Sequence, residues 1–146
     1  MALLKDLQLS IYIALDLETT GLDPYSCGIT EVSAYRFENG QPVEEFTTLI
    51  DPERAIPKEI SELTGITPDM VLGKPKINKV LPDLFDFIGD NPIVGQNIGF
   101  DISFLEYACR ENGKSLPEYI IYDTLTLAKT FLFFFSPDMF KSTPVY

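Results

Sequence analysis

Near the start of the chain, residues 11–21 read Ile11-Tyr12-Ile13-Ala14-Leu15-Asp16-Leu17-Glu18-Thr19-Thr20-Gly21. Apolar residues occupy every second position from Ile11 to Leu17, and the alternate positions include Asp16 and Glu18. A period of two is the spacing of a β-strand, whose successive side chains point to opposite faces. The pattern predicts a strand with one apolar face. Both carboxylates share the other face, about 6 to 7 Å apart at Cβ.

This carboxylate pair is a candidate site for divalent cations. Carboxylate oxygens are the ligands that Mg²⁺ and Mn²⁺ prefer, and two such ions about 3.5 to 4 Å apart could be bridged there. The strand also runs directly into the turn at Gly21, and α/β sheets place ligands at such strand ends. A solvated acidic face on an edge strand is the alternative, since exposed strands often carry acids.

The rest of the chain alternates between strand and helix patterns. Two β-rich runs, 31–37 and 43–50, flank Asn39-Gly40, which predicts an antiparallel hairpin. The following connection, rich in Pro, Thr and Gly, is expected to hold one short helix. Hydrophobic periodicity then predicts these further elements: a helix between Pro75 and Asp90, a strand at 93–94, a helix from Asp101 to Asn112, a strand at 119–122 and a helix from about Asp123.

A hairpin followed by alternating strands and helices predicts an α/β fold, with a mixed sheet and helices on its faces. A chain of 146 residues buries roughly 70% of the surface that its unfolded form exposes, which suits one hydrophobic core. We therefore expect a single domain over residues 1–146.

The composition restricts the possible functions. The 22 acidic and 11 basic residues give a net charge of −11, which argues against binding nucleic acid by bulk electrostatics but not against metal-assisted chemistry on it. No apolar run approaches the roughly 20 residues that span a bilayer, and no signal peptide is evident, so we expect a cytoplasmic protein without membrane association. The two cysteines, Cys27 and Cys109, are expected to be reduced.

Two further acids precede predicted helices. Asp101 follows the loop Gly95-Gln96-Asn97-Ile98-Gly99-Phe100, and Asp123 follows Tyr122. Aspartate is a favoured helix N-cap, so capping competes with metal binding at Asp101 and is the preferred interpretation at Asp123.

Four segments in order, residues 16–21, 63–67, 94–101 and 122–125, resemble the motifs of the DEDD family of 3′-5′ exonucleases. The likeness is greatest to the proofreading exonucleases of bacterial replicative polymerases, the epsilon-subunit type. It implies an RNase H-like fold and a substrate that is the 3′ end of single-stranded DNA or RNA. A DNA polymerase subunit is the implied protein partner.

The resemblance also implies site residues. Asp16, Glu18 and Asp101 match the catalytic residues that hold two Mg²⁺ or Mn²⁺ ions. The positions that match substrate contacts are Thr19, Thr20, Gly21, Leu63, Ile66, Asn97 and Phe100. For Phe100, a place in the core at a helix start is an equally good interpretation.

The chain departs from the family pattern in its third motif, where a His serves as general base and an Asp as a fourth ligand. It contains no histidine, and Gln96 stands where the family often has one. We therefore expect a fold that lacks the last helix of the family, a C-terminally incomplete domain and a weakened exonuclease.

Two other functions remain open on the sequence. One is an inactive exonuclease-fold module or fragment that binds a protein partner or itself through the apolar run Phe131–Phe135. The other is an acidic α/β protein unrelated to nucleic acid, in which Asp101 and Asp123 are only helix caps.

Overall fold

The computed structural model describes residues 9–135, with side chains described for residues 9–130. The elements follow one another along the chain as β1 (Ile11–Thr19), β2 (Ile29–Glu38), β3 (Gln41–Leu49), α2 (Lys58–Thr64), α3 (Pro68–Val71), α4 (Ile77–Ile88), β4 (Ile93–Gly95), α5 (Gly99–Glu111), β5 (Ile121–Asp123) and α6 (Thr124–Phe135). Within the part described, no helix is long and apolar enough to cross a membrane.

The five strands form one mixed sheet in the order β3-β2-β1-β4-β5. The first three strands pair antiparallel, whereas β4 and β5 run parallel to β1. Asn39 and Gly40 both adopt positive φ, at 50° and 81°, as a tight hairpin turn with right-twisted strands requires. The predicted mixed sheet and the predicted hairpin are thus confirmed.

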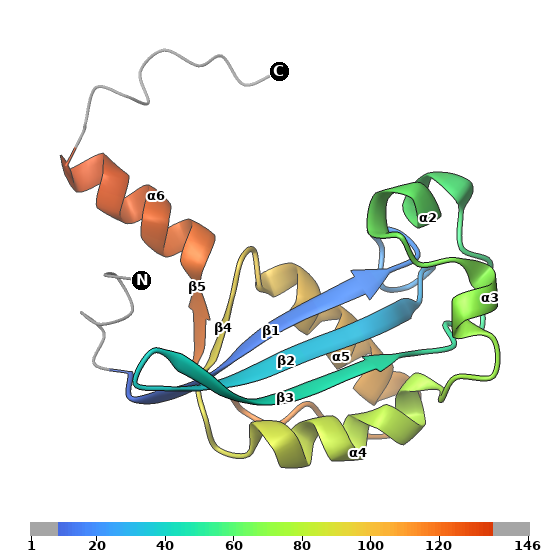
Figure 1. Cartoon of the computed structure of the whole chain (residues 1–146), viewed down its shortest axis with the longest axis horizontal. Coiled ribbons are helices and arrows are strands. Elements are labelled where there is room, and N and C mark those ends of the chain that lie inside the picture. The colour runs from blue at the N-terminus through green and yellow to red at the C-terminus, as the bar shows by residue number, and fades with distance from the viewer. Residues whose placement is uncertain (1–8, 136–146) are drawn as a thin grey trace.

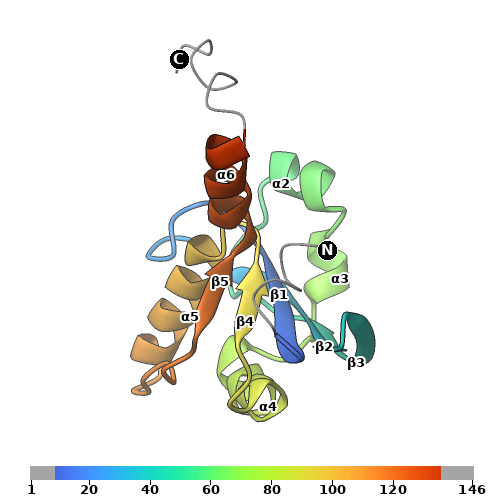
Figure 2. The same ribbon diagram turned by 90° about the vertical axis from the view of Figure 1, so that its left-hand side faces the viewer.

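The apolar face of β1 packs against α4 and α5, which cover the same side of the sheet (Figures 1 and 2). From β1 this core takes Ile13, Leu15 and Leu17, as the alternation predicts. The buried residues that α4 and α5 contribute are Val80, Leu81, Leu84, Ile88, Ile102, Phe104, Leu105, Ala108 and Cys109. Asp16 and Glu18 therefore lie on the side of β1 away from this core.

The structure differs from the sequence prediction in the connection after β3. The single short helix expected there is wrong, because two helices form, α2 and α3. Gly65 ends α2 with a φ of 77°, and Thr67 starts α3 immediately before Pro68. Gly supplies the left-handed turn at low cost and Pro suits the first position of a helix, so the chain stops and restarts within three residues.

Two boundaries also shift, since β5 begins at Ile121 and α5 at Gly99. The run Phe131–Phe135 falls within α6, but its side chains lie outside the described residues.

Candidate active site

The site is built around the end of β1. Asp16 is exposed and Glu18 is half-buried, in keeping with their place on the face away from the core. Across the β1–β2 ladder Glu18 lies opposite Glu31, which adds a third carboxylate to this side.

Beyond the end of β4, no strand of the described part of the chain pairs with that edge of β1. The ladder between β1 and β4 joins only Ile13 and Ala14 of β1 to β4. Ile13 donates its N–H to Pro92 on that edge, and the period of two places the N–H of Leu17 on the same edge. Asp101 fills the gap: its Oδ1 accepts the Leu17 N–H at 2.8 Å.

Asp101 is therefore not a helix cap. It is the third residue of α5, and the capping position is held by Ile98, which makes no side-chain capping bond. Its side chain is 4% exposed and turned toward β1. The capping alternative for Asp101 is wrong, because its carboxylate accepts the N–H of Leu17 in β1 and the residue lies within the helix rather than at the capping position.

Asp123 does cap its helix, as the sequence predicts. Its Oδ1 accepts N–H bonds from Leu125 at 2.9 Å and Thr126 at 3.4 Å in the first turn of α6.

The pKa values of the three predicted ligands are all raised, in each case first by burial. Desolvation by burial, followed by the nearby charges of Asp16 and Glu18, raises the pKa of Asp101 to about 6, against the opposing hydrogen bond from Leu17. Burial also raises the pKa of Asp16, and that of Glu18 rises through burial and then through repulsion by Asp16 and Glu31. A bound cation would relieve this repulsion.

Asp16, Glu18 and Asp101 all offer carboxylate oxygens, which are the type of ligand that a hard divalent cation prefers. Within residues 9–135, however, no group of three or more His, Cys, Asp or Glu is gathered closely enough to hold a metal ion. Asp101 is fixed against Leu17, whereas Asp16 and Glu18 are freer to rotate because they are more exposed. Closing the three carboxylates around one ion therefore requires rotation of the β1 side chains.

The turn after β1 is stabilised by its own hydroxyl groups. Thr19 Oγ1 donates to the carbonyl of Gly21 at 2.7 Å, and Thr20 Oγ1 accepts the N–H of Gly28 at 3.0 Å. Thr20 N also donates to the Gly28 carbonyl at 2.8 Å, which closes the loop of residues 21–27 at its base. At Gly21 a Cβ would lie 2.6 Å from Cys27 Sγ, so any other residue there would require the Cys27 side chain to shift.

The two predicted apolar contacts differ in accessibility. Leu63, near the end of α2, is 81% exposed. Ile66 is 4% exposed and packs with Ile56 and Val71 in a small second core. Because α2 lies beyond the C-terminal end of β1 (Figure 1), Leu63 is the one of the pair that offers an open apolar surface.

Asn97 lies in the loop before α5, and Phe100 is the second residue of that helix. Asn97 is exposed, has a φ of 53° and donates its N–H to Asp123 Oδ1 at 3.0 Å. Phe100 is half-buried, with its ring centroid 5.0 Å from that of Phe104, and packs against the main core. The contact between Asn97 and Asp123 was not foreseeable, because it joins residues 26 apart in sequence that the pairing of β4 with β5 brings together.

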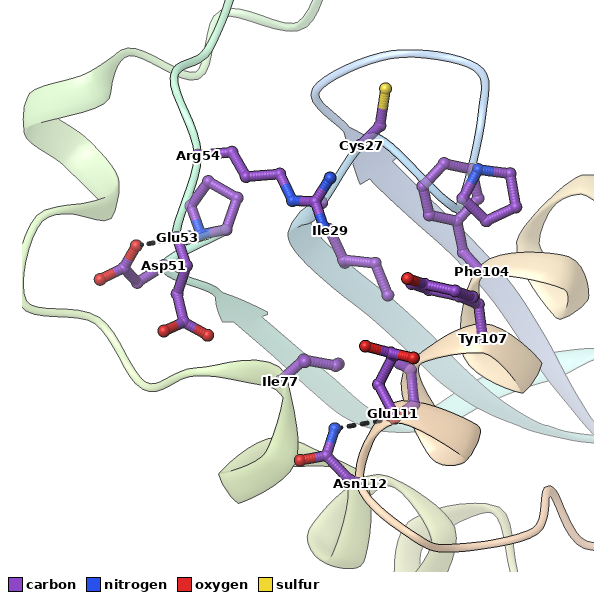
Figure 3. A pocket seen from close by; sticks show the side chains of 14 residues that line it. Cys27, Ile29, Asp51, Glu53, Arg54, Ile77, Phe104, Tyr107, Glu111 and Asn112 are labelled. Atoms are coloured by element: carbon purple, nitrogen blue, oxygen red, sulfur yellow. Dashed lines mark hydrogen bonds between the residues drawn. The ribbon is translucent and has the colours of Figure 1, made fainter.

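A separate cavity of about 350 Å³ is lined in part by Pro24 and Cys27 of the loop after β1 (Figure 3). Arg54 extends toward Ile29 from one wall, and Tyr107 and Glu111 of α5 form the opposite wall. None of the predicted site residues lines this cavity.

Comparison with known proteins agrees with these features. The family model described as exonuclease (RNase T type) matches residues 13–139. The chain belongs to this exonuclease family. That assignment bears out the resemblance to DEDD exonucleases, and exonucleases of this fold are metal-dependent.

This exonuclease-family chain is similar to parts of longer proteins. It is 37% identical over 130 residues to the PolC-type DNA polymerase III of Clostridium perfringens. The matched region covers 89% of the chain and 9% of that relative. It is 40% identical over 104 residues to the DNA polymerase III subunit epsilon of Aquifex aeolicus, which covers 70% of the chain and 52% of the relative. The chain thus spans less than two thirds of either relative.

Solved structures confirm the fold. Exonuclease I of E. coli, in a structure described as a complex with a dT13 oligonucleotide, superposes with a TM-score of 0.75. The match covers 89% of this chain and 31% of exonuclease I at 17% identity. The expected RNase H-like mixed sheet with flanking helices is therefore correct for the elements described here.

Proposed function

We propose that this chain is a metal-dependent exonuclease that removes nucleotides from the 3′ end of single-stranded DNA or RNA. The main observation behind the proposal is the hydrogen bond that brings the Asp101 carboxylate of α5 against β1. A buried carboxylate from α5 lies beside the strand that bears Asp16 and Glu18, and its pKa is raised by burial first and then by the charges of these two acids. Perturbed carboxylates of this kind cluster at functional sites.

Asp16, Glu18 and Asp101 would hold the ions, and their all-oxygen donor set favours Mg²⁺ or Mn²⁺. When bound, such ions activate water and stabilise the leaving oxygen of a phosphodiester. The chain itself supplies a fixed Asp101, two rotatable acids on β1, and the exposed Leu63 and Asn97 for the terminal nucleotide.

We further propose that turnover by this chain is slow. The 146 residues include no histidine, so the general base of the third motif has no counterpart. A positioned general base contributes about 10² to 10⁴ in rate. Because the relatives are named as DNA polymerase III proteins, a polymerase subunit is the proposed partner, which implies the cytoplasmic location expected from the sequence.

The test is digestion of 5′-labelled single-stranded DNA with Mn²⁺, with Mg²⁺ and with EDTA. We expect slow, Mn²⁺-dependent shortening from the 3′ end, which stops when a phosphorothioate linkage blocks that end. Asp16→Asn should abolish shortening, whereas Asp83→Asn, the same change at an exposed acid of α4, should not. Equal activity of the Asp16→Asn protein would refute the assignment, and a rate equal to that of E. coli exonuclease I would refute the slow turnover.

A non-catalytic binding module is the second candidate. It is favoured by the lack of any ready-made metal cluster within residues 9–135. Retention of labelled DNA without shortening would support it. The proposed self-association through Phe131–Phe135 is tested by sedimentation, where a concentration-independent monomer would contradict it.

A further inference from the structure

One oxygen atom joins the start of α6 to the loop between β4 and α5. Besides its two donors in α6, Asp123 Oδ1 accepts the N–H of Asn97, which lies 26 residues earlier. Partial burial alone would raise the pKa of this carboxyl, but the backbone donors outweigh it and lower the pKa. The carboxylate is thus ionised where it receives three N–H groups.

The neighbouring residue strengthens the same connection. Thr124 Oγ1 donates to the carbonyl of Gly95 at 3.2 Å, and Gly95 pairs with Asp123 in the β4–β5 ladder. The beginning of the loop and Asn97 are therefore both attached to the junction between β5 and α6.

The turn at Asn97 has an uncommon backbone conformation. Its φ of 53° is in the left-handed region, which residues other than glycine seldom adopt and which Asn tolerates better than most. The Asn97 carbonyl accepts the N–H of Phe100 at 3.0 Å, so the turn at Asn97 leads directly into the first turn of α5, where Asp101 lies.

We propose that Asp123 is a positioning residue of the active site. Its carboxylate fixes the backbone of Asn97, and through this turn it sets where Asn97 and Asp101 stand relative to β1. Asp123 acts through these two residues rather than on metal or nucleotide. The consequence for catalysis rests on the proposed function, but the hydrogen bond itself does not.

Three substitutions at one position separate this role from helix capping. Asp123→Asn keeps an oxygen for all three donors. Asp123→Ser keeps a cap for α6, because serine is a good N-cap, but its hydroxyl is one bond shorter and does not reach Asn97. Asp123→Ala loses both contacts. Thr130→Ala, which removes a hydroxyl bonded to Thr126 O later in α6, is the control for the helix alone.

The readouts are the NMR shift of the Asn97 amide, the melting temperature, the Kd for Mn²⁺ and the KM for single-stranded DNA. We expect Asp123→Asn to resemble the wild type in all four. Asp123→Ser should keep the melting temperature of Asp123→Asn but move the Asn97 amide upfield and weaken Mn²⁺ binding about tenfold or more, as losses behind a metal ligand do. KM should rise with it.

If Asp123→Ser and Asp123→Asn share the same Asn97 shift and the same Mn²⁺ affinity, Asp123 is only a cap and the inference is overturned. Failure of the proposed function has a different signature, namely a wild-type protein that neither binds Mn²⁺ nor shortens DNA. In that case the NMR shift of the Asn97 amide still reports whether Asp123 fixes the loop. If this shift is the same in Asp123→Ser as in the wild type, the fixing role of Asp123 is overturned too.

Discussion

The carboxylate of Asp101 accepts the backbone N–H of Leu17 at 2.8 Å, across 84 residues of sequence. It takes the place of a strand partner at the point where β1 continues beyond β4. A buried N–H without an acceptor is costly, so this carboxylate contributes to the sheet as well as to the proposed metal site. Burial and the charges of Asp16 and Glu18 disfavour the ionised form of Asp101, whereas the Leu17 N–H and a bound cation favour it. The first two predictions follow from that conflict.

Replacing Asp101 with Asn should stabilise the metal-free protein at neutral pH. The folded pKa of Asp101 is about 6 against an ordinary 3.8, so the native state holds its proton more tightly than the unfolded state. The free energy of unfolding should therefore fall as the pH rises from about 4 to about 6 and stay low above that. Asn keeps an oxygen for Leu17 without the charge, which should add about 1 to 3 kcal/mol at pH 7.

Urea unfolding of both proteins with EDTA at about pH 4.5 and pH 7.5 measures this difference. Asp83→Asn, at an exposed acid of α4, is the matched control and should leave the stability nearly unchanged. If the Asp101→Asn protein is less stable than the wild type at the higher pH, the charge of Asp101 does not destabilise the folded state.

Stabilisation by Mn²⁺ should depend on pH in the opposite direction. A metal binds the deprotonated carboxylate, so binding must displace the proton that Asp101 retains below about pH 6. We expect a larger rise in melting temperature on adding Mn²⁺ at pH 7.5 than at about pH 5, reversed by EDTA and reduced in Asp16→Asn. An equal rise at both values would place the ion elsewhere.

Gly95→Ala should destabilise the fold. An added Cβ would lie 2.9 Å from the carbonyl oxygen of Leu15 and 2.5 Å from Ile98 Cδ1, because β4 passes close to β1 there. Overpacking of this kind costs about 1 to 3 kcal/mol. Gly99→Ala is the control, since nothing lies within 4 Å of its added Cβ and Ala favours a helix. Thermal unfolding of the pair should separate them, and equal melting temperatures would contradict the close approach.

Thr20→Val should loosen the loop after β1. Val has nearly the same shape as Thr, but it leaves the N–H of Gly28 without the acceptor that it has at 3.0 Å. The expected cost is about 1 to 3 kcal/mol in the free energy of unfolding. Thr20→Ser, which keeps the hydroxyl, should recover most of it. Faster proteolysis within residues 21–27 of Thr20→Val is a second measurement, and its absence would count against a role in closing the loop.

The sequence predicted the elements whose signals are local. The alternation in residues 11–18 located β1, Asn39-Gly40 located the hairpin, and the spacing of apolar residues located α4. The connection after β3 was predicted poorly, because α2 and α3 are too short to show a period and depend on Gly65 and Pro68 for their limits.

The residues of the site were predictable from the sequence, but the contacts between them were not. Asp16 and Glu18 follow from one strand, whereas the bond from Leu17 to Asp101 depends on where β4 ends, which no local pattern reports. Ile66 illustrates the same limit, since its burial with Val71 comes from a tertiary contact. The link between Asp123 and Asn97 is likewise a product of the β4–β5 register.

The outer strand of the sheet has a consequence for the solution behaviour of the protein. Among the strands of residues 9–135, β3 is paired only with β2, and a strand with one open edge is a template on which other chains can add. Pro42 removes one donor from this strand, and the exposed Glu44 and Glu45 add acidic side chains, of which Glu44 is paired with Arg36. In a molecule with a net charge of −11, the proline and these acids make the edge a poor template for intermolecular sheets.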